Sequence, residues 1–259
     1  MFSLVTGASR GIGIEYARTL ARDYGSDLLI ISSKEEDIQA VAADIAGDYG
    51  VNVIPLAMDL AVPDAAERLF AFTEEQGLEV DVLINNAGMF FFNPLIETDM
   101  RRIERMLTLH ILTVTKLCRL FGEKMCRRGS GFILNMSSLS TWMMCPGIQT
   151  YNASKSYLYN FTRSLWYEFK PKGVHVMVVT PGMVDTTLYG LKPELRALAV
   201  KICVNTPTPR LAKKALRRLF RRRKCCMPGF INHVSKPFLK HLPDWLVFWV
   251  MRKIAKYQK

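Results

Sequence analysis

Several features that would point away from an ordinary globular domain are missing from this 259-residue sequence. The longest unbroken apolar run, Trp245–Met251, is far shorter than the roughly 20 residues that a helix needs to span a bilayer. No basic leader with an apolar stretch precedes the first strand-like run, so we expect no signal peptide. There is also no internal repeat and no low-complexity linker. The sequence therefore predicts a protein without a transmembrane helix.

Cysteine and histidine patterns typical of metal sites are missing too. None of the six cysteines forms a Cys-x-x-Cys pair, and the four histidines show no ligand spacing. A zinc site and a disulfide-stapled secreted scaffold are both disfavoured, and we expect no bound metal. Reduced thiols are typical of the cytosol, so a cytoplasmic location is predicted.

Acidic residues are scarce near the C-terminus. Residues 1–191 hold 17 Lys/Arg and 21 Asp/Glu, whereas residues 192–259 hold 18 Lys/Arg and two acidic residues, giving net charges of −4 and +16. A segment this basic either meets an anionic partner (lipid headgroups, an acidic ligand or nucleic acid) or is a well-solvated face. With 49% hydrophobic and 22% charged residues, the whole chain otherwise has the composition of one globular α/β domain.

Short β-branched apolar runs alternate with helix-period stretches up to about residue 181, which is typical of a parallel sheet. The runs are Ser3–Thr6, Asp27–Ile31, Val51–Ala57, Val80–Ile84, Gly131–Met136 and Val174–Thr180, with Cys225–Met227 as a last short strand. Nearly continuous apolar strands indicate burial on both faces. We therefore predict an α/β, doubly wound, single-domain fold with a parallel sheet of about seven strands and helices on both faces.

The pattern changes after Gly182. Residues 183–209 contain scattered apolar residues that suit a substrate lid or an ordinary amphipathic helix. A helix opened by Thr208-Pro209 has one apolar and one basic face, and a further helix is opened by Pro243-Asp244. Residues 210–259 are thus predicted to be a basic, apolar, helical extension of the single domain spanning 1–259.

The first strand runs into a glycine-rich turn, Thr6–Gly13, with the spacing Gly-x-x-x-Gly-x-Gly. Glycines let the backbone approach a pyrophosphate, which the N-terminus of the following helix attracts. Taken alone, the turn is also compatible, though less well, with a tight strand-to-helix connection that binds nothing. Further motifs close later strands, at Asn85–Gly88, Asn135–Ser138 and Pro181-Gly182, and Tyr151 and Lys155 follow Ser138. All of them fall at the carboxyl edge of the predicted sheet, where such sheets bind ligands.

This combination of motifs resembles the short-chain dehydrogenase/reductase family over residues 2 to about 187, and implies a Rossmann fold and hydride transfer between a nicotinamide and a carbonyl or carbinol carbon. Tyr151 is similar to the acid/base of the family, Lys155 to the residue that holds the nicotinamide ribose, and Ser138 to the group that orients the substrate. By the same resemblance, the cofactor-binding residues are Gly7, Ser9, Arg10, Gly11, Ile12, Gly13, Ser33, Lys34, Asp59, Leu60, Asn86, Ala87, Gly88, Tyr151, Lys155, Pro181, Gly182, Val184 and Thr186.

Elementary chemistry supports the roles of the tyrosine and the lysine. Four residues apart on one helix, Tyr151 and Lys155 share a face, so an ammonium favours the ionised phenol. A phenol with a reference pKa of about 10 then becomes a proton donor and acceptor closer to neutral pH. A lone Tyr/Lys pair is more often a solvated surface pair; the spacing to Ser138 and the cofactor motifs favour catalysis here.

One position departs from the family pattern. Many members carry an asparagine in the helix that follows the Asn-Asn-Ala-Gly strand, where it holds a water in the proton relay to the lysine. The stretch Met106–Leu112 places His110 in that slot. His110 either positions the same water or is a polar residue tolerated beside the core; activity retained in His110→Asn would indicate the relay.

The residue that ends the second strand decides the cofactor. An NAD(H)-specific site usually has an acid there, which binds the ribose hydroxyls and repels a 2′-phosphate. Here Ser32, Ser33 and Lys34 occupy the position, and Arg10 lies nearby in the motif. The acids that follow, residues 35–37, resemble the first turn of the next helix. We predict NADP(H), with NAD(H) as the alternative.

The expected substrate is a hydrophobic ketone or alcohol, steroid-like or 3-oxoacyl, because apolar residues surround the predicted cleft at 90–92 and 142–144. A catalytically impaired regulator or scaffold is the alternative, with His110 as its only support. Nucleic-acid binding is disfavoured since no recognised module is visible.

The tail leaves two interpretations open. Residues 237–253 combine two tryptophans, a short apolar helix and flanking cations, which is the composition of a helix lying on an anionic membrane. The other interpretation is a helix packed on its own domain or across the interface of a homodimer or homotetramer, the assemblies common in the family.

Overall fold

A computed structural model of the chain describes residues 1–182, 184, 206–229, 232–233, 238–239, 241 and 243–254. Within these ranges the strands form one seven-stranded sheet in the order β3-β2-β1-β4-β5-β6-β7, and every neighbouring pair is parallel. The strands are β1 Phe2–Thr6, β2 Asp27–Ser32, β3 Val53–Ala57, β4 Val82–Asn85, β5 Gly131–Met136, β6 Val174–Val179 and β7 Cys225–Cys226. The predicted doubly wound parallel sheet is confirmed, including its short last strand.

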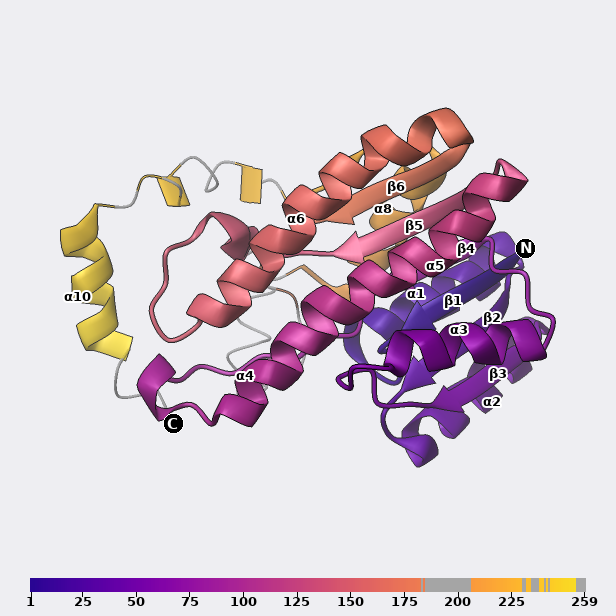
Figure 1. Cartoon of the computed structure of the whole chain (residues 1–259), viewed down its shortest axis with the longest axis horizontal. Helices are drawn as coiled ribbons and strands as arrows, with labels where there is room; N and C mark the ends of the chain where they lie inside the picture. Colours follow the sequence, from indigo (N-terminus) through magenta and orange to yellow (C-terminus); the bar gives the residue numbers. More distant parts are fainter. Residues whose placement is uncertain are drawn as a thin grey trace.

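Helices cover both faces of the sheet (Figure 1). One face carries α1 (Gly11–Tyr24), α2 (Glu35–Tyr49) and α8 (Thr208–Phe220) over one apolar cluster. The other carries α3 (Ala65–Glu75), α5 (Thr113–Arg128) and α6 (Gln149–Phe169) over a second. Successive residues of β2 illustrate the cause, because Leu28 and Ile30 join the first cluster whereas Leu29 and Ile31 join the second.

The remaining described elements lie outside these two layers of helices. They are α4 (Met100–Leu107), the π-helical turn η2 (Thr108–Leu112), α10 (Asp244–Ile254) and the 3₁₀ turns η1 (Leu95–Glu97), η3 (Leu139–Trp142) and η4 (Lys170–Lys172). Helix α8 has the predicted two faces: Leu211, Leu216 and Leu219 are buried, and Lys213 and Lys214 are exposed. Among the described helices, none combines the length and apolarity needed to cross a membrane.

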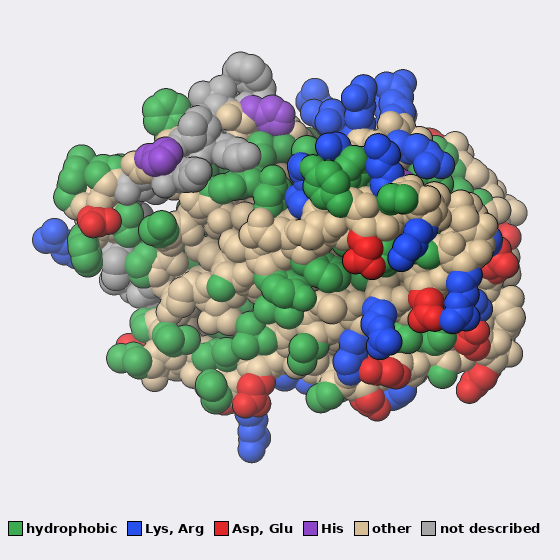
Figure 2. All heavy atoms as spheres, turned by 45° about the horizontal axis from the view of Figure 1, so that its top comes forward, with side chains coloured by type: hydrophobic (Ala, Val, Ile, Leu, Met, Phe, Trp, Pro, Cys, Tyr) green, Lys and Arg blue, Asp and Glu red, His purple; other side chains and the backbone are tan. Residues whose placement is uncertain are grey.

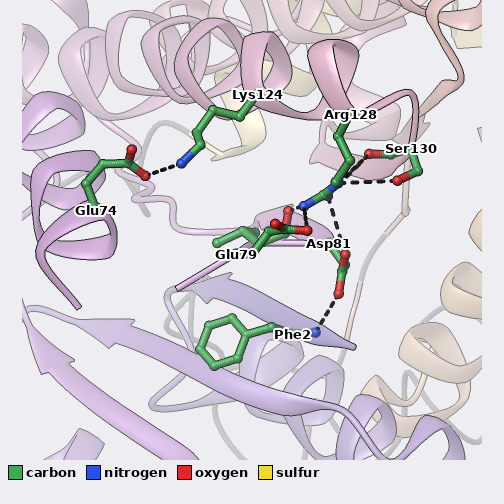
Figure 3. A network of polar contacts seen from close by, with 8 residues as sticks. Phe2, Glu74, Glu79, Asp81, Lys124, Arg128 and Ser130 are labelled. Carbon is green, nitrogen blue, oxygen red and sulfur yellow. Dashed lines mark hydrogen bonds and ion pairs between the residues drawn. The ribbon is translucent and has the colours of Figure 1, made fainter. Parts of the chain in front are cut away.

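The amino ends of β1 and β4 are held by a polar network (Figure 3). The Asp81 carboxylate accepts a hydrogen bond from the Phe2 backbone N–H at 2.9 Å and lies 3.3 Å from the Arg128 guanidinium. Arg128 also pairs with Glu79 and donates to the Ser130 carbonyl oxygen. These groups occupy the sheet edge opposite the predicted site, so their role is to fix the ends of the strands.

Most of the predicted lid, residues 183–209, falls outside the described residues. At its ends, Val184 pairs with Thr206 in an isolated parallel bridge. The segments 230–231 and 234–237 and residues 240, 242 and 255–259 of the predicted extension also lie outside the described part.

Candidate active site

The carboxyl ends of β1, β2, β4, β5 and β6 meet at one edge of the sheet, and a cavity of about 370 Å³ opens there. The cavity is lined by Gly7, Ser9, Arg10, Gly11, Ile12, Ile31, Ser32, Ser33, Met58, Asp59, Leu60, Ala61, Asn86, Ala87, Gly88, Met89, Arg105, Leu109, Met136, Ser137, Ser138, Tyr151, Lys155, Pro181 and Val184. Most of the residues predicted from the sequence are therefore brought together. Gly13, Lys34, His110 and Gly182 do not line it, and Thr186 lies outside the described residues.

The glycine-rich turn owes its shape to close backbone packing. A Cβ atom on Gly7, whose φ is +67°, would lie 2.8 Å from the Ala87 Cα, and one on Gly13 would lie 2.0 Å from the Gly7 carbonyl oxygen. The Asn86 side-chain amide donates to the carbonyl oxygens of Thr6 and Gly7 at 3.0 and 3.2 Å. Gly13 thus supports the turn from behind, while Gly7 lines the cavity.

The surface at the end of β2 carries hydroxyls and a cation. Ser32 and Ser33 line the cavity, and the Ser32 hydroxyl donates to the Ser9 hydroxyl at 2.9 Å. Arg10 is exposed and directly precedes the first turn of α1. The acids at 35–37 form the first turn of α2, as predicted, and do not line the cavity. The described residues at this point therefore suit a phosphate better than a ribose diol.

An ion pair borders the cavity at Asp59. The Arg105 guanidinium lies 2.9 Å from its carboxylate, and the Ala61 backbone N–H donates to it at 2.9 Å. Burial acts to raise the pKa of Asp59, but these two contacts outweigh burial and the net pKa is lowered. Arg105 was missed by sequence reasoning, because no motif links a residue of α4 to the strand that precedes α3.

Lys155 and Tyr151 project from the first two turns of α6 into the cavity. The Lys155 Nζ atom lies 5.6 Å from the centre of the Tyr151 ring and donates to the Met136 carbonyl oxygen at 3.0 Å. Burial lowers the pKa of Lys155 to about 8. Ser137, also missed by sequence reasoning, anchors this helix by donating to the Lys155 carbonyl oxygen at 2.7 Å.

Ser138, which also lines the cavity, caps η3. Its Oγ atom accepts a hydrogen bond from the Ser140 backbone N–H at 3.1 Å, so the hydroxyl hydrogen is directed elsewhere and can be donated to a substrate oxygen. The Tyr151 ring packs edge-on against Phe90 and His110, with centroid separations of 5.1 and 5.8 Å. A carbonyl oxygen placed between Ser138 and Tyr151 would meet two hydroxyl donors.

His110 lies behind the cavity wall, in the π-helical turn η2. It is buried, with 1% of its surface exposed, and its ring packs edge-on against that of Tyr151. Its Nε2 atom lies 3.0 Å from the Met89 backbone nitrogen, and its Nδ1 atom lies 2.9 Å from the Ser154 hydroxyl.

Apolar side chains predicted to surround the cleft take varied positions. Phe90 packs on Tyr151, Phe91 lies under the Arg102 guanidinium at 5.0 Å, and Trp142 packs on Tyr159 at 5.1 Å. Met144 is 80% exposed. The described residues contain no cluster of three or more His, Cys, Asp or Glu that suits a metal ion.

A parallel sheet with a glycine-rich turn, together with a serine, a tyrosine and a lysine in one cavity, defines an oxidoreductase that binds a nicotinamide dinucleotide. Comparisons with known proteins agree. A family model described as short chain dehydrogenase matches residues 2–194. The chain therefore belongs to the short-chain dehydrogenase family, and the predicted family and fold class are confirmed.

Relatives and solved structures add detail. A very-long-chain 3-oxoacyl-CoA reductase of Anas platyrhynchos is 35% identical over 192 residues, which cover 72% of this chain but only 61% of that protein. The Homo sapiens protein of the same name is 28% identical over 98% of this chain and 80% of its own length. A short-chain dehydrogenase from Sphingobium yanoikuyae in complex with NADPH is 26% identical with a TM-score of 0.79, covering 93% of this chain and 96% of that one. Its cofactor agrees with the predicted NADP(H).

Proposed function

We propose that this protein catalyses the NADPH-dependent reduction of a hydrophobic ketone, with 3-oxoacyl thioesters as the substrate class. The convergence of Ser138, Tyr151 and Lys155 on the cavity carries the proposal, because these residues supply a hydrogen-bond donor, a proton donor and a cation. The names of the two vertebrate relatives support the acyl substrate. The same groups also serve alcohol oxidation, and the intact trio argues against the alternative of an impaired regulator.

Each of the three residues has a separate role in the proposed reduction. NADPH supplies the hydride when bound. Ser138 holds the substrate oxygen through its hydroxyl hydrogen, and Tyr151 delivers a proton to the same oxygen as negative charge develops there. Lys155 places a positive charge 5.6 Å from the Tyr151 ring, which favours the phenolate left behind.

Rates with a substrate panel test the proposal. With a long-chain 3-oxoacyl-CoA, a ketosteroid and a sugar ketone as substrates, we expect the acyl thioester to give the highest kcat/KM. Because no acid lies at the end of β2, we expect NADPH to bind at least tenfold tighter than NADH, about 1.4 kcal/mol. Ser33→Asp, which introduces that acid, should reduce this preference.

Two outcomes would contradict the proposal. Equal affinity for NADPH and NADH, measured by titration at constant salt, would rule out the phosphate subsite. Absence of turnover on every ketone and alcohol, although NADPH binds, would favour the regulator instead.

We propose further that the protein is peripheral to an anionic membrane, which it contacts through α10. Trp245, Phe248 and Trp249 are 70%, 61% and 52% exposed, and their spacing places them on one side of the helix with exposed Arg252 one turn further on. Figure 2 shows hydrophobic side chains at the end of the molecule where α10 lies, while most of the lysines and arginines visible in this view lie away from that end. Aromatic rings and cations on one helix suit an anionic interface.

The position of α10 fits a lipid-derived substrate. The strands point toward the end of the molecule at which α10 lies (Figure 1), and the cavity lies at their carboxyl ends. An apolar ketone dissolved in the bilayer would then reach the cavity directly. A packed helix at a homodimer or homotetramer interface is the alternative, and both the assembly and the cytoplasmic location stay predictions.

Co-sedimentation with vesicles tests the membrane contact. We expect the full chain to bind vesicles of phosphatidylglycerol at least tenfold better than vesicles of phosphatidylcholine at low salt, since each cation near an anionic surface contributes about 1 kcal/mol. The triple variant Trp245→Ser, Phe248→Ser, Trp249→Ser should lose this binding. Tyr167→Ser, which removes an exposed aromatic ring on α6, is the matched control and should retain it.

The charged face of α8 is the other candidate for the membrane contact, and its substitution tests the assignment to α10. If Lys213→Glu with Arg217→Glu abolished binding while the triple serine variant retained it, α8 would be the contact and the assignment to α10 would be wrong. Equal binding to both vesicle types would exclude an anionic membrane as partner.

A further inference from the structure

A directed chain of hydrogen bonds runs from the cofactor cavity to the helix of Tyr151 through His110. The Met89 backbone N–H can only donate, so His110 Nε2, 3.0 Å away, accepts. In a neutral imidazole the hydrogen is then on Nδ1, which donates to the Ser154 hydroxyl at 2.9 Å. The Ser154 hydroxyl in turn donates to the Tyr151 carbonyl oxygen at 2.7 Å. The donor and the acceptor of each hydrogen bond in this chain are therefore fixed.

The surroundings keep the imidazole in this form. Burial, together with the positive charge of Lys155, holds the pKa of His110 well below its usual value, so the ring stays neutral at physiological pH. The π-helical turn Thr108–Leu112 carries the ring into the space behind the cavity wall. A Cβ on Gly88 would lie 3.2 Å from Nε2, so a residue without a side chain is what lets the ring reach the Met89 N–H.

We propose that His110 is a positioning residue: it ties the Gly88–Met89 segment of the cofactor cavity to the first turn of α6 and carries no proton in the reaction. A relay through the ring would have to break both bonds, because Nε2 is occupied by an amide N–H that has no proton to give and Nδ1 by Ser154. This inference rests on the proposed function only where it refers to the reaction that Tyr151 assists. It replaces the predicted water-relay role of His110 by a structural link between cofactor and acid/base.

The link has two halves that substitutions can separate. The amide nitrogen of asparagine matches the position of Nδ1, so His110→Asn keeps a donor for Ser154 and loses the acceptor for Met89. The terminal oxygen of glutamine reaches the position of Nε2, so His110→Gln keeps the acceptor for Met89 and loses the donor for Ser154. Ser154→Ala removes the same half as the glutamine variant.

These variants should affect different measured quantities. We expect His110→Asn to raise the Kd for NADPH about tenfold, the cost of one lost hydrogen bond in a buried site, with a smaller effect on kcat. His110→Gln and Ser154→Ala should leave the Kd for NADPH near that of the wild type and lower kcat about tenfold. His175→Asn is the control, since His175 is a buried histidine that contacts the Arg223 carbonyl oxygen away from the cavity. It should lower the melting temperature without changing kcat or the Kd.

Nitrogen NMR of ¹⁵N-histidine-labelled protein with NADPH reads the tautomer directly, without any substrate. We expect His110 to be neutral with its hydrogen on Nδ1 between pH 6.5 and 9. A ring that titrates in this range, or that carries its hydrogen on Nε2, would overturn the proposal, as would full activity and unchanged NADPH affinity in His110→Asn. Because the NADPH titration and the NMR spectrum need no ketone, they stand even if the substrate assignment fails.

Discussion

Tyr151→Phe is expected to lower kcat for ketone reduction by at least about 100-fold, the usual contribution of a positioned acid or base. The substitution removes only the phenolic hydroxyl, so the proton donor is lost while the ring keeps its edge-on contacts with Phe90 and His110. The Kd for NADPH and the melting temperature should therefore change little. Single-turnover measurements with saturating NADPH would isolate the chemical step.

A second tyrosine on α6 supplies the control. Tyr157 is 37% exposed, and its hydroxyl lies 2.9 Å from the Thr115 hydroxyl, outside the cavity lining. Tyr157→Phe should keep the kcat of the wild type. If Tyr151→Phe retains more than about a tenth of kcat, the acid/base is another group and the proposed mechanism is wrong.

The sequence allowed the fold to be predicted because the strands are continuous apolar runs with polar or glycine-rich ends. The run Gly131–Met136 coincides with β5, and Cys225–Met227 is close to β7 at Cys225–Cys226. Some predicted runs extend beyond the strand that forms. The run that contains β3 begins at Val51, whereas β3 itself begins at Val53. Hydrophobicity reports burial, whereas a strand boundary depends on which backbone groups are paired.

That Ser138, Tyr151 and Lys155, the proposed catalytic trio, share one cavity could be predicted because they lie at fixed spacings along one strand end and one helix. Arg105 and the anchoring contact of Ser137 could not be predicted, since both depend on contacts between elements distant in sequence. The hydrogen-bond partners of His110 could not be predicted either. Its place in the family slot could be predicted, but the donor at Met89 and the acceptor at Ser154 depend on how η2 packs between two other elements.

Lys155, the lysine of the proposed catalytic trio, is buried at a cost to stability. Its pKa in the folded protein is about 8, whereas a lysine in an unfolded chain has a pKa of about 10.4. Between these values the unfolded chain binds more protons than the folded one, so the stability of the wild type rises with pH through this window. Below pH 8 both states are charged, and the folded state carries the whole penalty of burying the ammonium.

Lys155→Met is expected to remove this pH dependence, because methionine has a similar length and no charge. A shift of roughly 2.5 pK units at 1.36 kcal/mol each predicts that the difference in unfolding free energy between variant and wild type changes by about 3 kcal/mol from pH 7 to pH 10.5 in favour of the wild type. The lost hydrogen bond to the Met136 carbonyl oxygen affects both ends of the range alike and cancels from this change. Urea unfolding across the range measures it.

Lys116→Met is the matched control, since the Lys116 side chain is exposed and pairs with Glu67 at the surface. Its difference from the wild type should stay constant across the same range. A constant difference for Lys155→Met as well would mean that Lys155 is not desolvated in the fold. In that case the ammonium beside Tyr151 would be screened by solvent, and it would stabilise the phenolate less.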